Sequence, residues 1–340
     1  MVLSAKVKKS LNIGFRIVIA LLAFWFIYRQ VVVTGDFEHF RLLFLERAGN
    51  SRFVLIVLMV LIMMPLNWGV ETVKWKLLIS YVEKISFFSA FRSVMTGIST
   101  SLFTPNRVGE FFGRVFTLKL ADPLKGVLLT IAGSLSQLIV TLLFGSFSLI
   151  AFLPLYFDTN QLWARYLYFG VVLFVIIGAV FMIMLFLRSP VLSASIHSMV
   201  KPGWNKIHEY IAVLQSVERK VLLKVLLLSM FRYLIFSTQF YLMLRAFDLS
   251  IPFLHAFMLI SMTYFVATAI PTVALVDLGI RGSVAIYFIG MYFKQGEQVA
   301  MAILSATTTI WIVNLALPAL LGLLFINRLT FIRKSTSDVK

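Results

Sequence analysis

Cysteine is absent from the sequence, and histidine and acidic residues are rare. Without cysteine, the chain can form no disulfide, no thiolate metal site, no iron–sulfur cluster and no thiol nucleophile. The four histidines lack the short spacing of zinc ligands: His39, His197, His208 and His255. We therefore expect neither a bound metal nor a cofactor.

Catalytic and nucleotide-binding motifs are also missing. The sequence has no G-x-S-x-G elbow, Walker loop, H-E-x-x-H motif, dinucleotide-binding fingerprint or glycosylation sequon. The acidic residues are scattered and form no evident pair for acid–base chemistry. We expect that the chain is not an enzyme and that ATP-driven transport would need another subunit.

Charged residues make up only 13% of the 340 residues, and hydrophobic residues make up 60%. Soluble domains carry about 25% charged residues. The apolar residues form repeated runs of roughly twenty, which is the length of a membrane-spanning helix. The sequence therefore predicts an all-α polytopic membrane protein with a single transmembrane domain over residues 1–340.

The formal net charge is +17, from 31 Lys and Arg against 14 Asp and Glu. In a membrane protein, basic cytoplasmic loops and anionic lipid headgroups explain such a charge, so we expect no nucleic-acid partner. Basic residues before the first apolar run, with no small-residue cleavage site after it, indicate an uncleaved first helix with a cytoplasmic start.

Full crossings are expected over residues 13–33, 53–81, 126–153, 162–187, 221–246 and 299–326. Surface helices are expected near Phe37 to Phe44 and near Trp204 to Leu214, where apolar residues recur at helical spacing. Two further apolar regions, 91–120 and 253–293, are interrupted by Pro105 and Pro271.

The basic residues favour one topology. The connection 154–161 contains no Lys or Arg, whereas 188–224 is strongly basic. If every apolar region crossed, both connections would violate the positive-inside rule, so we expect about six crossings and two re-entrant broken elements. Both termini are then cytoplasmic, and residues 1–157 and 158–340 form inverted pseudo-repeats, an arrangement typical of transporters.

The first break concentrates charge in the stretch from Ser101 to Leu120. Thr104, Pro105 and Asn106 precede Arg107, and Gly109, Glu110 and Arg114 follow. The N-terminus of a helix that restarts inside a membrane attracts anions. The planar guanidinium group of arginine can also bind a phosphate through two parallel hydrogen bonds. Glu110 could pair with one arginine when the site is empty, or accept a hydrogen bond from an amine or a sugar hydroxyl. The alternative for Arg107 and Arg114 is snorkelling to the inner surface without any ligand.

Other candidate substrate-binding residues lie elsewhere in the chain. Glu71 and Lys74 share a helix face with Asn67, although Glu71, Lys74 and Lys76 could also be ordinary charges at the cytoplasmic end of a helix. Asp277 and Arg281 follow the second break, and Arg232 is a candidate partner for Asp277 or Glu110. Gly109 and Gly113 are spaced to let another helix approach closely.

Three pieces of the sequence resemble the flippase-like membrane family related to the transmembrane region of lysylphosphatidylglycerol synthases. They are Asn67-Trp68 with Glu71 and Lys74 to Leu78, Thr104 to Glu110 with Arg114, and Pro271 with Leu278 to Gly282. The resemblance covers nearly the whole chain. In the second break, Val276-Asp277 and Arg281 to Ser283 replace part of the Gly-rich piece that the family carries.

The resemblance implies movement of a lipid, or of a lipid-linked sugar or phosphate, between leaflets. It also implies that Arg107, Glu110, Arg114 and Arg281 lie at or near the path. We expect no lysyl-lipid synthesis, because no aminoacyl-transfer domain follows Lys340. We expect a bacterial inner-membrane protein that carries an anionic phospholipid or polyprenyl phosphate, with a homo-oligomer or a partner enzyme as further possibilities. The alternatives are a membrane enzyme or accessory subunit acting on lipid-linked sugars, and a scaffold.

Overall fold

The computed structural model describes residues 5–28, 37–102, 104, 107–118, 120, 122–158, 161–191, 205–270, 274–293 and 296–328. Every regular element within these ranges is a helix. Five helices in the described part are long and apolar enough to span a bilayer. They are α3 (Ser51–Ile79), α6 (Pro123–Tyr156), α7 (Leu162–Leu187), α10 (Arg219–Ala246) and the run Glu297–Leu323. The prediction of an all-α membrane protein is confirmed.

The last of these runs is not uniform. It begins as α13 (Glu297–Trp311), passes through a π-helical segment (Ile312–Ala316) and ends as α14 (Leu317–Leu323). A π-helical segment widens the backbone locally, and such segments occur often at functional sites. The single helix expected over 299–326 is present, with this change inside it.

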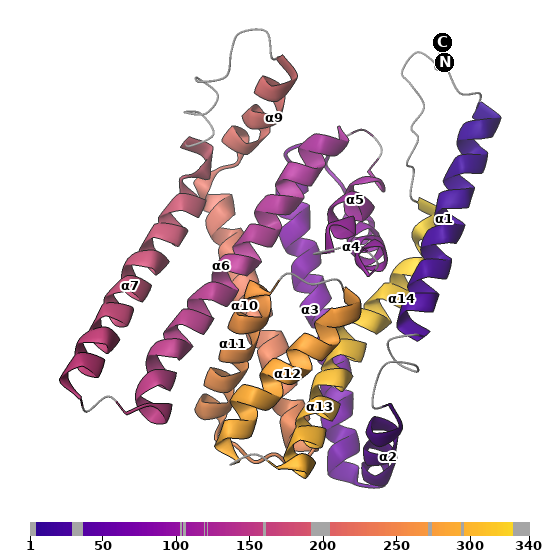
Figure 1. Ribbon diagram of the computed structural model, residues 1–340. Coiled ribbons are helices and arrows are strands. Elements are labelled where there is room, and N and C mark those ends of the chain that lie inside the picture. The colour runs from indigo at the N-terminus through magenta and orange to yellow at the C-terminus, as the bar shows by residue number, and fades with distance from the viewer. Residues whose placement is uncertain are drawn as a thin grey trace.

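Two short helices lie at opposite ends of the molecule (Figure 1). One end carries α9 (Asn205–Ser216) and the start of α1 (Ala5–Tyr28). The opposite end carries α2 (Phe37–Ala48). Both expected surface helices therefore exist as helices, although Trp204 lies outside the described residues.

The two broken regions form helical pairs near opposite ends of the molecule (Figure 1). The first pair, α4 (Phe87–Ser101) and α5 (Gly109–Val115), lies toward the end with α9 and the start of α1. The second pair, α11 (Phe253–Ala269) and α12 (Ala274–Tyr292), lies toward the end with α2. Pro105 and Pro271, which predicted the breaks, lie outside the described residues.

Small residues let α4 and α5 pack very closely. A Cβ atom added to Gly113 would lie 2.0 Å from Thr100 Oγ1, and one added to Gly109 would lie 2.1 Å from the Thr100 carbonyl oxygen. The hydroxyl of Thr100 also donates a 2.7 Å hydrogen bond to the carbonyl of Gly109. The prediction that Gly109 and Gly113 permit a close helix approach is confirmed, and the helix that they contact is α4.

The centre of the fold is formed by α3, which packs along α10 and α6. Trp75 of α3 is buried and donates a 3.0 Å hydrogen bond to Thr130 Oγ1 of α6. In contrast, α7 packs against the rest of the molecule mainly through α6 and leaves large apolar side chains such as Phe174 and Phe181 exposed. An exposed apolar face of this kind suits lipid contact. The interior of the protein is therefore built around α3, α6 and α10.

Candidate functional site

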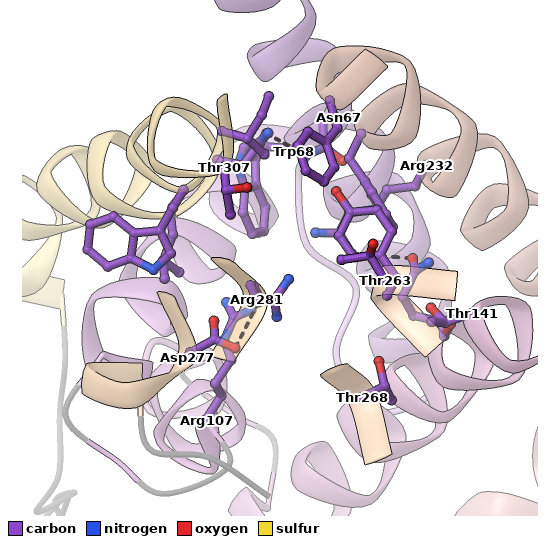
Figure 2. A pocket seen from close by; sticks show the side chains of 18 residues that line it. Asn67, Trp68, Arg107, Thr141, Arg232, Thr263, Thr268, Asp277, Arg281 and Thr307 are labelled. Atoms are coloured by element: carbon purple, nitrogen blue, oxygen red, sulfur yellow. Dashed lines mark hydrogen bonds and ion pairs between the residues drawn. The ribbon is translucent and has the colours of Figure 1, made fainter. Parts of the chain in front are cut away.

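A cavity of about 220 Å³ lies where the central helices meet the two broken regions. Its wall includes residues of α3, α6, α10, α11, α12, α13 and the π-helical segment. The charged residues that line it are Arg107, Arg232, Asp277 and Arg281 (Figure 2). Arg107 comes from the first break, and Asp277 and Arg281 come from the second. The fold thus brings both predicted breaks to one internal space.

Glu71 of α3 is the centre of a buried ion-pair network beside this cavity. Its carboxylate lies 2.8 Å from Lys74 Nζ and 2.8 Å from Arg114 Nη1. Glu71, Lys74 and Arg114 are 4%, 1% and 2% exposed. Charges buried this deeply require partners, because desolvation of an isolated charge is very costly. The interpretation of Glu71 and Lys74 as ordinary charges at a helix end is therefore wrong.

Arg114 joins the central helix α3 to the first break. One of its terminal nitrogens contacts Glu71, and the other is paired with Glu110 four residues earlier in α5. Glu110 also lies 3.6 Å from Arg107 Nη2. Arg114 does not snorkel to the surface, because it is buried against two carboxylates. Of the two roles considered for Glu110, the structure shows the pairing with an arginine.

Arg107 has an unusual backbone. Its φ angle is +59°, in the left-handed region that residues other than glycine rarely adopt. This conformation costs about 1–2 kcal/mol, and strain of this kind is concentrated at functional sites. The Arg107 amide donates a 3.2 Å hydrogen bond to the carbonyl of Thr104, which stabilises the turn. The strained turn places the Arg107 side chain in the cavity wall.

Thr104 supports the backbone of the first break. Its Oγ1 atom accepts a 2.8 Å hydrogen bond from the amide of Gly109, the first residue of α5. An amide at the start of α5 is therefore already satisfied within the protein. Thr104 and Gly109 do not line the cavity, and Pro105 and Asn106 lie outside the described residues. Among the described residues of this region, Arg107 lines the cavity.

Arg232 of α10 approaches the cavity from the opposite side to Arg107 (Figure 2). Its guanidinium carbon lies 4.9 Å from the centre of the Trp68 ring, and its Nη1 lies 3.4 Å from Glu71 and 3.3 Å from Gln137 Oε1. The expected pairing of Arg232 with Asp277 or Glu110 is wrong. Because α10 packs along α3, Arg232 lies beside Glu71 instead.

Asp277 and Arg281 form their own pair on α12. Arg281 Nε donates a 2.7 Å hydrogen bond to Asp277 Oδ1, as expected for opposite charges four residues apart on a helix. Their side chains are 13% and 36% exposed, so the arginine is the more accessible of the two. Figure 2 shows Arg107 on the same side of the cavity as this pair. The two breaks thus contribute neighbouring charges to the cavity wall.

Sequence reasoning missed two amide side chains, Asn314 and Gln239, which form a hydrogen-bonded chain with Asn67 of the cavity wall. Asn67 Nδ2 donates to Asn314 Oδ1 at 2.9 Å, and Asn314 Nδ2 donates to Gln239 Oε1 at 3.0 Å. Asn314 belongs to the π-helical segment. Gln137, which contacts Arg232, was also missed. The sequence did contain a signal for these residues: each is an Asn or Gln inside an apolar helix. Polar side chains in that position usually form hydrogen bonds to a neighbouring helix.

The structure therefore defines an all-helical integral membrane protein with a charged internal cavity between two broken helical elements. The chain belongs to the family described as the lysylphosphatidylglycerol synthase TM region, which matches residues 13–326. The resemblance inferred from the sequence motifs is confirmed by this match. No curated protein and no solved structure matches the chain. Family membership links the protein to lipid handling in a membrane.

Proposed function

We propose that the protein moves an anionic lipid, or a lipid-linked phosphate, between the leaflets of a bacterial inner membrane. The observation that carries this proposal is the shared cavity, which is lined by Arg107 of one break and by Asp277 and Arg281 of the other. Ionisable side chains inside a membrane protein are costly and usually mark a substrate or ion path. Family membership supports a lipid as the substrate.

The proposed transport rests on a proposed topology. In it, about six helices cross the bilayer and the pairs α4–α5 and α11–α12 enter from opposite sides and return. Their positions near opposite ends of the molecule support this arrangement (Figure 1). The two halves then form inverted repeats, and alternating exposure of the cavity to each leaflet would carry a headgroup across.

Cysteine labelling tests the topology, because the chain has no native cysteine. Asp158, between α6 and α7, and Ser216, at the end of α9, are both exposed. In intact cells, a membrane-impermeant maleimide is expected to label Asp158→Cys and not Ser216→Cys. In opened cells it should label both. Labelling of Ser216→Cys alone from outside would contradict the topology.

A membrane enzyme that acts on lipid-linked sugars is the second function considered, and the structure does not favour it. Catalysis of that kind needs an acid and a base that face the substrate. Among the described residues, Asp277 is the acidic residue that lines the cavity, and it is already paired with Arg281. Glu71 and Glu110 lie behind the wall and are surrounded by cations. We therefore propose a transporter without catalytic activity.

Reconstitution tests the proposed function. The purified protein is inserted into phosphatidylcholine vesicles that contain a trace of fluorescent anionic phospholipid, and dithionite then bleaches the outer leaflet. Lipid translocation should allow dithionite to bleach well beyond the outer-leaflet half, whereas protein-free vesicles should stop at about that half. If protein vesicles behave as the empty ones for phosphatidylglycerol, phosphatidic acid and polyprenyl phosphate alike, the transport proposal fails.

A further inference from the structure

The charged side chains of the site fall into two groups. The first group lies behind the cavity wall and is held together by the ion pairs around Glu71 and Arg114. Its members are Glu71, Lys74, Glu110 and Arg114. Two formal negative charges face two formal positive charges, so this inner group is balanced. It leaves no charge for a ligand to compensate.

The second group lines the cavity and is not balanced. Its members are Arg107, Arg232, Asp277 and Arg281. Three positive charges stand against one negative charge. Arg107 and Arg232 also lie 3.6 Å and 3.4 Å from Glu110 and Glu71, but Arg114 and Lys74 already balance those two carboxylates. The two groups together therefore carry five positive and three negative charges, a surplus of two. Within the described residues, no other acidic side chain lines the cavity. A surplus of cations in a low-dielectric interior is unfavourable unless an anion compensates it.

Hydrogen-bond donors in the cavity wall also lack acceptors. The Nε atoms of Arg107 and Arg232 are buried and have no hydrogen-bond partner. The same is true of Trp68 Nε1, on a side chain that is only 2% exposed. All three residues line the cavity. Buried donors without acceptors cost free energy, so the site suits a ligand rich in acceptor oxygens.

We propose that the cavity binds the dianionic phosphate of a lipid phosphomonoester, such as phosphatidic acid or a polyprenyl monophosphate. A phosphomonoester carries a charge of about −1.5 to −2 near neutral pH and three acceptor oxygens. It therefore matches both the double positive surplus and the donors without acceptors. A phosphodiester lipid carries a single negative charge and leaves half of the surplus uncompensated. This assignment rests on the proposed function and names its substrate class.

Native mass spectrometry of the full-length protein tests the assignment. The protein is equilibrated in detergent with equal amounts of phosphatidic acid and phosphatidylglycerol of identical acyl chains, and separately with sodium phosphate. At pH 7.5, retained phosphatidic acid should exceed phosphatidylglycerol by about tenfold or more, the ratio that one uncompensated charge readily produces. At pH 5, below the second phosphate pKa of about 6, the ratio should fall toward one.

Two substitutions move the charge surplus in opposite directions. Arg281→Gln reduces it to one and should lower the preference for phosphatidic acid by about tenfold. Asp277→Asn raises it to three and should keep or increase the preference. Misfolding would lower lipid retention in both variants, so it cannot explain a preference that falls in Arg281→Gln and is kept or raised in Asp277→Asn. Arg245→Gln, on α10 but outside the cavity wall, is the matched control and should leave the ratio unchanged.

Each outcome bears on the assignment. Equal retention of the two lipids at pH 7.5 overturns the phosphomonoester class, but it leaves lipid transport intact if vesicles still show translocation. Retention of inorganic phosphate without either lipid identifies a site for free phosphate and overturns the lipid assignment. Preference for phosphatidic acid that persists at pH 5 also contradicts it, because the dianion is then mostly absent.

Discussion

Glu71→Ala protein is expected to lose about 3–5 kcal/mol of unfolding free energy, the cost of leaving buried charges without their partner. Lys74 and Arg114 both lie 2.8 Å from the Glu71 carboxylate, and Arg232 lies 3.4 Å from it. Removing this one side chain leaves three cations facing one another inside the protein. Thermal unfolding of the detergent-purified protein and its expression level in membranes measure the loss.

The matched control for Glu71 is an exposed glutamate in a salt bridge. Glu209 pairs with Lys125 at 3.1 Å, but its side chain is 63% exposed. Exposed ion pairs contribute about 0–1 kcal/mol, so Glu209→Gln should change stability little. A second test adds Lys74→Leu to Glu71→Leu, which should recover part of the lost stability because one of the three cations that Glu71 faces is then removed as well. Equal effects of Glu71→Ala and Glu209→Gln would contradict the buried network.

Arg281→Gln is expected to slow lipid translocation by about tenfold to a hundredfold, the factor that loss of one charge-assisted hydrogen bond produces. Arg281 lines the cavity and is the more exposed member of its pair with Asp277. The Arg281 guanidinium can therefore bind an anion in the cavity while its Nε atom stays hydrogen-bonded to Asp277. The rate of dithionite bleaching in proteoliposomes measures the change.

Two controls separate a loss of transport from a loss of structure in the Arg281 variant. Its thermal unfolding should remain close to that of the wild type, because Arg281 lies outside the network of Glu71. Arg245→Gln should keep the wild-type translocation rate, because Arg245 contacts Ser250 at the far end of α10. An unchanged rate in a well-folded Arg281→Gln protein would remove Arg281 from the substrate path.

The helices were predictable because their signals are local. Leu162–Leu187 was predicted at the residues where α7 begins and ends, since a long apolar run whose one charged residue, Arg165, lies in its first turn has few alternatives. Gly109 and Gly113 correctly predicted a close helix approach, because their spacing places both on one helix face. Pattern alone also identified the two broken regions, where proline and charged residues interrupt apolar runs.

The pairing of the charges was not predictable to the same degree. Arg232 was a candidate partner for Asp277 or Glu110, but it contacts Glu71, because the register of α10 against α3 decides its neighbour. No local pattern encodes that register. Asn314 was missed for a related reason: its importance depends on Asn67 and Gln239, which are distant in sequence. The sequence identified the charged residues, and tertiary packing determined which of them meet.

The central claim is that residues from both breaks act on one bound lipid, and a double-mutant cycle tests it most directly. Translocation rates are measured for the wild type, Arg107→Gln, Arg281→Gln and the double variant, each checked for folding. If both arginines hold the same headgroup, the double variant should be little slower than the slower single variant. If the effects of the two substitutions simply multiply, the arginines act independently and the claim of one shared site is contradicted.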